Sequence, residues 1–309
     1  MSHSDLIIGA FLDDPKRTLS GEALARRLGV SRTSVWKHIK ALQEEGYRIE
    51  VLKGRGYRLK GLSARPIERE VKRGLLTERF GQRVFYYEKI GSTNDVVKEL
   101  ARRGEKEGTL VIAEEQLNGR GRLDRSWESP RGGVFMSLIM RPNLHPTELT
   151  RLILLSGVAV ARAIKSLYGL DGRLKWPNDI FYEDKKLGGI LSEMEGEAER
   201  VNFVVVGIGI DANCNVSVDI PTTSLKKETG REINIIKLVQ EILKEVESLY
   251  EAFMKGSLAF LEEYKELSHT LGRDVKIVRL KDTIVGRAVD IDSNGALVLR
   301  LPDGSYEKV

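Results

Sequence analysis

The sequence is poor in cysteine and histidine, with a single cysteine, Cys214, and four histidines in 309 residues. One cysteine excludes an internal disulfide and fits a reducing compartment, and the scattered histidines do not have the spacing of a metal site. No apolar run reaches the length of a membrane span, and no basic region precedes the apolar stretch near the N-terminus. We therefore expect a cytoplasmic protein with no membrane partner.

Several common catalytic and nucleotide-binding motifs are also missing. The sequence contains no G-x-x-x-x-G-K-[ST], and the loop that begins at Gly119 reads G-R-G-R-L-D, without the third glycine of G-x-G-x-x-G. The protein-kinase motifs are absent, and no Ser-His-Asp or Cys-His arrangement is readable. We expect any reaction to depend on arginine, lysine and backbone donors rather than on an activated nucleophile.

The positive charge is concentrated near the N-terminus. The net charge is +5, yet residues 1–65 hold 13 Lys and Arg against 7 Asp and Glu, whereas residues 66–309 hold 37 against 38. This asymmetry indicates a nucleic-acid partner for the N-terminal segment.

The same segment has the pattern of a winged helix-turn-helix. Helical periodicity fits residues 5–15, 20–29 and 31–46, with a tight turn at Gly29-Val30, and a basic hairpin follows in residues 47–61. The alternative is a small helical domain with a solvated basic face. We expect Arg32, Thr33 and Lys37 to contact the base edges of an operator DNA. We expect Lys40, Lys53 and Arg55 to contact its phosphates.

The remainder of the chain predicts an α+β multidomain protein. Residues 62–70 have the pattern of a linker that enters a helix, and strands then alternate with helices to about residue 268, as in a mixed sheet with packed helices. Residues 270–309 have short strand patterns separated by turn residues. The expected domains are residues 1–62, 66–268 and 270–309.

The loop Gln116–Trp127, QLNGRGRLDRSW, holds three arginines and two glycines. Its glycines exclude an ordinary strand or helix, and its guanidinium groups suit an anionic ligand. A flexible solvated loop is the alternative.

Motifs across nearly the whole chain resemble those of one family. GSTN, EEQLNGRGRLDRSWESPRGG, KWPND, KKLGGIL and GIGI occur in the order found in biotin–protein ligases, and the winged helix resembles that of the bifunctional type, the biotin operon repressors. The resemblance implies a class II synthetase-like catalytic domain and a C-terminal SH3-like β-barrel. It also implies ATP and Mg²⁺ as cofactors, biotin as the substrate, and transfer of biotin through biotinyl-5'-AMP to a lysine of a biotin carboxyl carrier protein.

The resemblance also assigns roles to individual residues. The residues implied to contact biotin are Ser92, Thr93, Asn94, Gln116, Gly119, Arg120, Gly121, Arg122, Lys186 and Gly188. Those implied to bind the nucleotide are Arg122, Trp127, Lys175, Asn178, Asp179 and Asp211. Lys186, Arg120 and Arg122 are implied to be catalytic, and Asp179 is a candidate for holding the metal or its water.

Simpler roles remain open for several of these residues. Ser92 to Asn94 could be a plain helix cap, and Trp127 could be a core residue. Lys185 is the expected surface neighbour of Lys186, because side chains alternate along a strand. The sequence departs from the family at Asp211, where the family usually has asparagine; an acid there could weaken adenylate binding or lie near the metal. Family members generally continue for another short strand after the position of Val309.

The resemblance further implies that biotinyl-5'-AMP acts as a corepressor that favours a homodimer on DNA. Two other functions remain open at this stage. A lipoate–protein ligase has the same catalytic fold, and a biotin-sensing transcription factor could lack ligase activity.

Overall fold

The structure of the chain is a computed structural model that describes residues 2–14, 17–197, 200–216, 218, 220–279 and 282–309. The chain divides into two compact units, residues 1–73 and 74–309. The three expected domain boundaries stay predictions. No helix in the described ranges is both long and apolar enough to cross a membrane.

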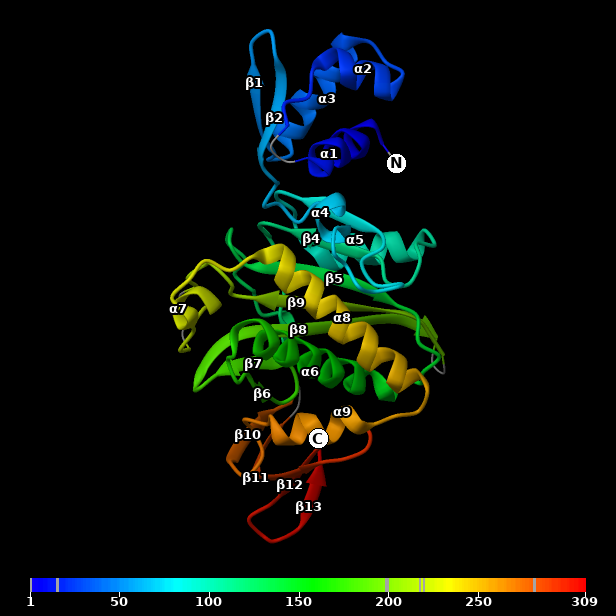
Figure 1. Cartoon of the computed structure of the whole chain (residues 1–309). Coiled ribbons are helices and arrows are strands. Elements are labelled where there is room, and N and C mark those ends of the chain that lie inside the picture. Colours follow the sequence, from blue (N-terminus) through cyan, green and yellow to red (C-terminus); the bar gives the residue numbers. More distant parts are fainter. Residues whose placement is uncertain (1, 15–16, 198–199, 217, 219, 280–281) are drawn as a thin grey trace. The chain divides into compact units, whose positions relative to one another are not determined.

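The first unit contains the expected three helices, α1 (His3–Asp13), α2 (Gly21–Leu28) and α3 (Arg32–Glu44) (Figure 1). The Ser20 and Ser31 hydroxyls each accept a backbone N–H at the start of α2 and α3, and Gly29 ends α2 in the left-handed conformation with φ 67°. Val35, Ile39 and Leu42 of α3 are buried, so one face of this helix packs inward, and the predicted helix-turn-helix is confirmed.

The predicted hairpin also forms. Strands β1 (Arg48–Leu52) and β2 (Gly56–Gly61) are antiparallel, and the pairing of Leu52 with Gly56 leaves residues 53–55 as the tip. Gly54 adopts φ 74° there, a conformation that favours glycine. Helix α4 (Glu68–Lys72) closes the unit, within the region predicted as a linker entering a helix.

The second unit is built on a mixed seven-stranded sheet, as expected. Its order is β3-β4-β5-β9-β8-β7-β6, and among the described strands of this sheet only the β3–β4 pair is parallel. The strands are β3 (Val84–Tyr87), β4 (Leu110–Ala113), β5 (Val134–Met140), β6 (Arg173–Lys175), β7 (Asp179–Tyr182), β8 (Lys185–Glu197) and β9 (Arg200–Ile210). In the KWPND region, β6 and β7 pair across the Trp176–Asn178 turn.

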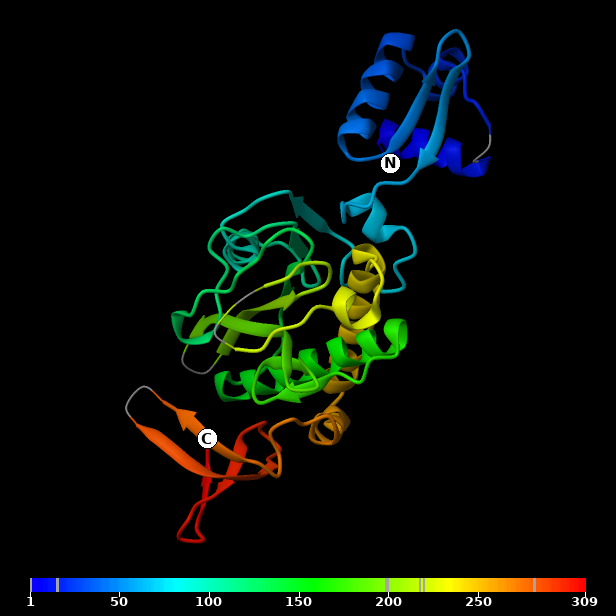
Figure 2. The same ribbon diagram turned by 90° about the vertical axis from the view of Figure 1, so that its left-hand side faces the viewer.

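Helices cover both faces of this sheet. Helices α6 (Leu149–Tyr168) and α8 (Ile235–Met254) lie side by side on one face, and α5 (Thr93–Arg102) packs against β4, β5 and β9 on the other (Figures 1 and 2). Helix α8 is followed by α9 (Ala259–Glu266). The remaining helix, α7 (Leu225–Thr229), follows β9, and short 3₁₀ turns η1 (Arg122–Asp124) and η2 (Pro146–Glu148) flank β5.

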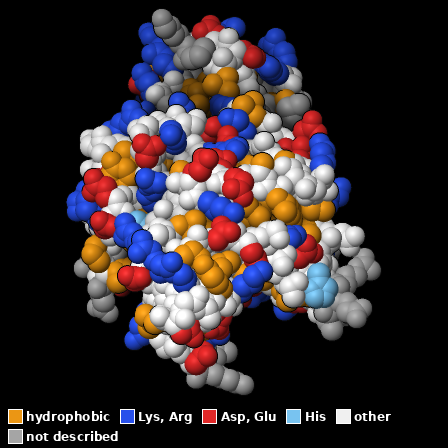
Figure 3. Space-filling model, turned by 90° about the horizontal axis from the view of Figure 1, so that it is seen from below, with side chains coloured by type: hydrophobic (Ala, Val, Ile, Leu, Met, Phe, Trp, Pro, Cys, Tyr) orange, Lys and Arg blue, Asp and Glu red, His pale blue; other side chains and the backbone are white. Residues whose placement is uncertain are grey.

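The C-terminal segment forms an antiparallel sheet, and its described strands do not close into the expected SH3-like barrel. Strands β10 (Asp274–Val278), β11 (Thr283–Ile291), β12 (Leu297–Arg300) and β13 (Tyr306–Lys308) pair only in sequence order. A barrel would need its first and last strands to pair, and β10 and β13 do not do so in the described part of the chain. Seen from below, hydrophobic, basic and acidic side chains are interspersed on the surface of the molecule (Figure 3).

Candidate active site

A buried polar cluster lies at the start of α5. Ser92, Thr93 and Asn94 are all buried, and Ser92 makes no side-chain capping bond, so a plain helix cap does not account for it. The Ser137 hydroxyl of β5 lies 2.7 Å from Thr93 Oγ1 and 2.6 Å from Asn94 Oδ1. Asn94 Nδ2 donates to Glu193 Oε2 of β8 at 2.6 Å. Sequence reasoning missed Ser137 and Glu193, which are distant in the chain.

Gln116 extends this cluster towards the arginine loop. The backbone N–H and the hydroxyl of Thr93 both donate to Gln116 Oε1, at 2.8 and 3.0 Å, and Gln116 Nε2 donates to Ser129 Oγ at 2.9 Å. The side chains of Ser137, Thr93, Gln116 and Ser129 therefore form one hydrogen-bonded chain. Such a chain fixes the positions of polar groups that could hydrogen-bond a small ring with N–H and C=O groups.

The loop with the three arginines, within Gln116–Trp127, forms a short hydrogen-bonded hairpin rather than an irregular solvated loop. The Trp127 N–H donates to the Gly119 carbonyl at 2.9 Å, and the Gly121 N–H donates to the Arg125 carbonyl at 2.7 Å. A Cβ at Gly119 would lie 2.3 Å from the Trp127 carbonyl oxygen, so the hairpin itself requires glycine there. We call residues 119–127 the arginine hairpin.

Glycines on β9 leave room for side chains above the sheet. A Cβ on Gly207 would lie 2.3 Å from Asn94 Oδ1, and one on Gly209 would lie 2.8 Å from Trp127 Nε1. Gly189 on β8 faces the same tryptophan, and a Cβ on this glycine would lie 3.3 Å from the Trp127 ring. The GIGI motif therefore accommodates both a residue predicted to contact biotin and one predicted to contact the nucleotide.

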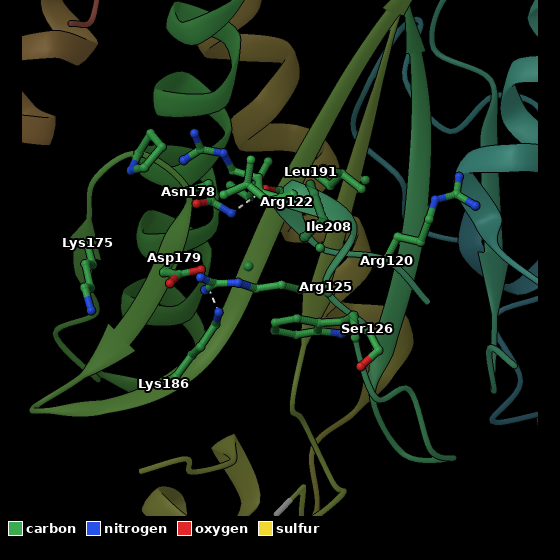
Figure 4. Close-up of a pocket in the computed structure, with 18 of the residues that line it drawn as sticks. Arg120, Arg122, Arg125, Ser126, Lys175, Asn178, Asp179, Lys186, Leu191 and Ile208 are labelled. Atoms are coloured by element: carbon green, nitrogen blue, oxygen red, sulfur yellow. Dashed lines mark hydrogen bonds and ion pairs between the residues drawn. The ribbon is translucent and has the colours of Figure 1, made fainter. Parts of the chain in front are cut away.

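Lys186 is paired with a carboxylate within the cavity. Its Nζ lies 2.7 Å from Asp179 Oδ1 and 5.0 Å from the centre of the Trp127 ring (Figure 4). Lys185 points elsewhere and pairs with Glu228 at 3.2 Å, as strand alternation predicts. Lys186 is thus the lysine of this pair that can meet a ligand.

The three hairpin arginines have different surroundings. Arg122 and Arg125 extend towards Asn178 and Asp179, whereas Arg120 extends to the opposite side, towards α5 (Figure 4). The pKa of Arg122 is lowered, chiefly because protein surrounds its guanidinium group and partly because Arg125 is near; the charge of Asp179 opposes this shift. A bound anion stabilises a poorly solvated cation without an ion-pair partner more than it stabilises a fully solvated cation, because the Coulomb attraction is less screened.

Asp211 is buried at the end of β9. Burial raises the pKa of Asp211 to about 7, and the effect outweighs a 3.5 Å hydrogen bond from the Cys214 thiol and the charge of Lys186. Burial also raises the pKa of Cys214, to about 12. Near neutral pH, Asp211 is therefore partly a neutral carboxylic acid, which has one donor and one acceptor as an asparagine side chain does.

One cavity of about 920 Å³ brings most of the predicted residues together. Gly119 and Gly188 do not line it; a Cβ on Gly188 would meet the Gly209 carbonyl oxygen at 2.6 Å, so close strand packing explains that glycine. The predicted residues that do line it are Ser92, Thr93, Asn94, Gln116, Arg120, Gly121, Arg122, Trp127, Lys175, Asn178, Asp179, Lys186 and Asp211.

The cavity lining is strongly basic. Seven Lys and Arg side chains line it, against three carboxyl side chains. Within the described part of the chain, three of these cations pair with carboxylates, and Arg122, Arg125, Lys175 and Lys276 do not. An excess of unpaired cations predicts a ligand with several negative charges.

The KWPND turn joins this site to the C-terminal sheet. The Trp176 backbone N–H donates to Thr270 Oγ1 at 2.8 Å, and its indole Nε1 donates to the Gly295 carbonyl at 3.0 Å. Lys276 and Val278 of β10 also line the cavity, although sequence reasoning did not select them. Long-range packing of this kind leaves no local signal in the sequence.

In the first unit, the six residues predicted to bind DNA are all exposed. Among the described residues, none of their five cations forms an ion pair with a carboxylate. The α3 surface and the hairpin tip thus have free positive charges for phosphates.

Comparison with known proteins agrees with this geometry. The biotin/lipoate A/B protein ligase family matches residues 86–211, an HTH domain matches residues 6–58, and the biotin protein ligase C terminal domain matches residues 270–309. The bifunctional ligase/repressor BirA of Bacillus spizizenii is 38% identical over 306 residues, which cover 96% of this chain and 94% of that protein. The chain belongs to the bifunctional ligase/repressor family. Its BirA relative from Escherichia coli is 33% identical, over 91% of this chain and 87% of that protein.

Solved structures of biotin protein ligases show the same fold for the part that they cover. The ligase from Aquifex aeolicus in complex with biotin and ATP is 26% identical and superposes with a TM-score of 0.64. The matched region covers 74% of this chain and 95% of the Aquifex chain. The Leishmania major ligase in complex with biotinyl-5-AMP is 24% identical, with a TM-score of 0.53 and coverage of 74% and 98%.

Proposed function

We propose that this chain is an ATP-dependent biotin–protein ligase that also acts as a biotin-responsive transcriptional repressor. The observation that carries the ligase function is one cavity with a fixed polar cluster at one end and unpaired cations at the other. The cluster suits the ureido ring of biotin, and the cations suit a nucleotide triphosphate. The BirA relatives and the ligase structure with biotin and ATP support this assignment.

The reaction has two steps. The biotin carboxylate attacks the α-phosphate of ATP, so that biotinyl-5'-AMP forms and pyrophosphate leaves. A lysine amine of a biotin carboxyl carrier protein then attacks the acyl carbon, forming an amide and releasing AMP and a proton. Lys186 and Arg122 would stabilise the negative charge that develops on the phosphate, which typically lowers the barrier by about 3–4 kcal/mol per donor.

A Mg²⁺ ion would neutralise the phosphates of bound ATP in this site. Mg²⁺ commonly uses one or two protein carboxylates together with phosphates and water, and Asp179 lies beside Lys186 in the basic cavity. Among the described residues no cluster of three potential ligand side chains could hold a metal by itself. The available donors fit an ion that enters with the nucleotide.

The ligase function is tested by the mass of a biotin carboxyl carrier domain after incubation with the chain, biotin, ATP and Mg²⁺. Wild type should add one biotin, Lys186→Ala should lose about 100-fold or more in rate, and Lys185→Ala should retain activity. No added biotin with wild type, despite binding of biotin, would favour a biotin sensor without ligase activity. Competition between biotin and lipoate distinguishes the lipoate–protein ligase alternative.

For the repressor function, biotinyl-5'-AMP would be the corepressor and a homodimer would bind a palindromic operator in the cytoplasm. The exposed basic face of α3 and the hairpin tip support DNA binding. The affinity for operator DNA and the sedimentation coefficient of the protein should both increase when biotin and ATP are added. DNA affinity that does not change with these ligands would contradict the coupling.

A further inference from the structure

We propose that Arg120 positions the arginine hairpin through Asp95 and does not itself bind the anionic groups of the ligand. Arg120 Nη1 lies 2.8 Å from Asp95 Oδ2, and Arg120 Nη2 lies 2.5 Å from Asp95 Oδ1. This two-bond geometry is the strong form of an arginine–carboxylate contact. The inference rests on the proposed ligase function, because it assigns a role within the same ligand site.

The ion pair joins two elements that must be aligned for ligand binding. Asp95 lies in the first turn of α5, directly after Thr93 and Asn94 of the polar cluster. Arg120 lies opposite Ser126 in the arginine hairpin. The hydrogen bonds between Thr93 and Gln116 form a second connection between the same helix end and the residues that precede the hairpin. Two connections to one helix end restrict the orientation of the hairpin.

The charges around Arg120 argue against a direct ligand contact. Its Nη2 also lies 3.8 Å from Glu193 Oε2, so two carboxylates face the guanidinium group. The hydrogen bond from Arg120 lowers the pKa of Asp95, which keeps that carboxylate charged. A ligand carboxylate or phosphate would have to displace Asp95. Arg122 and Arg125 point into the cavity without an ion-pair partner among the described residues, and we assign anion binding to them.

The benefit of the ion pair is preorganisation. A hairpin already held in its binding orientation loses less conformational entropy when the ligand binds. The side chains of Arg120 and Asp95 are 33% and 52% exposed, so solvent weakens their interaction. For such a pair we expect an effect of about twofold to fivefold on ligand affinity.

The test is a double-mutant cycle with biotin affinity and single-turnover adenylate formation as readouts. Asp95→Asn and Arg120→Gln should each weaken biotin binding by about twofold to fivefold, the double variant should be no weaker than either single variant, and Asp95→Glu should recover much of the loss. In Asp95→Asn, the rate of adenylate formation at saturating biotin and ATP should change little. Arg102→Gln, which breaks the exposed α5 ion pair with Glu195, is the matched control and should have no effect.

Three outcomes would overturn the proposal. In the first, Arg120→Gln slows adenylate formation about 100-fold while Asp95→Asn does not, which would show that Arg120 acts on the ligand. In the second, both variants match wild type. Hydrogen exchange of the hairpin amides, which requires no ligand, should be faster in Asp95→Asn, and unchanged exchange would also overturn it. If wild type failed to bind biotin, the proposed function would fail, and hydrogen exchange would still decide the positioning role.

Discussion

Lys186 and Asp179 form an ion pair at 2.7 Å between neighbouring strands β8 and β7, with the Lys186 ammonium 5.0 Å from the Trp127 ring centre. The strand pairing sets this contact, since Asp179 pairs with Gly189 and Lys186 pairs with Phe181. The position of the lysine therefore depends on a carboxylate that precedes it by only seven residues in the sequence.

Asp179→Asn should slow adenylate formation by up to about 100-fold, because Lys186 loses the partner that orients it. Biotin affinity should change little, since the polar cluster does not include Asp179. Single-turnover formation of biotinyl-5'-AMP measures the rate, and calorimetry measures the affinity. Asp184→Asn, at an exposed carboxylate outside the cavity lining, is the control. Equal rates for wild type and Asp179→Asn would contradict the orienting role.

Substitution of Gly207 and of Gly209 by alanine should weaken the binding of two different ligands. A Cβ on Gly207 would meet Asn94, so Gly207→Ala should weaken biotin binding by about tenfold or more; a Cβ on Gly209 would meet Trp127, so Gly209→Ala should weaken nucleotide binding similarly. Gly91→Ala, whose Cβ would have only a 3.8 Å contact, should leave both affinities unchanged. The assignment of the two ends of the cavity would be wrong if both variants lost the same ligand.

Asp211→Asn should change the pH dependence of stability. Burial raises the pKa of Asp211 from its ordinary value of 3.8 to about 7. Between these values the unfolded chain releases the proton and the folded chain retains it, so the contribution of this group to the stability of wild type falls as pH rises. The melting temperature of Asp211→Asn should therefore rise relative to wild type from pH 4 to pH 7. A difference that does not vary with pH would show that the carboxyl group is ionised throughout.

Substitutions on the DNA-binding face should separate phosphate contacts from base contacts. Lys53→Ala at the hairpin tip should weaken binding to all DNA sequences and reduce the slope of log affinity against log salt by about 1. Arg32→Ala should instead reduce discrimination between operator and non-operator DNA. Fluorescence anisotropy at several salt concentrations measures both effects. Sequence-selective loss with Lys53→Ala would contradict its assignment to phosphates.

The sequence predicts elements whose signals are local, and it misses contacts between distant segments. Serine caps, Gly29 and the buried periodicity of Val35, Ile39 and Leu42 define the helix-turn-helix within a short stretch. Motif resemblance selected Thr93 and Gln116, which the structure places in direct contact.

Ser137, Glu193 and Asp95 could not be selected, because their importance arises from partners brought together by the order of the sheet and by the fold of the hairpin. The open C-terminal sheet differs from the predicted barrel for a related reason. Short strand patterns indicate strands, but they do not determine whether the first and last strands pair.

The hydrogen bonds of Trp176 to Thr270 and Gly295 couple the stability of the active-site turn to that of the C-terminal segment. If this sheet unfolded locally, the Trp176 indole N–H would lose its acceptor and the turn before Asp179 would lose a support. Local unfolding of the C-terminal sheet and loss of nucleotide affinity should therefore occur together, as one cooperative transition.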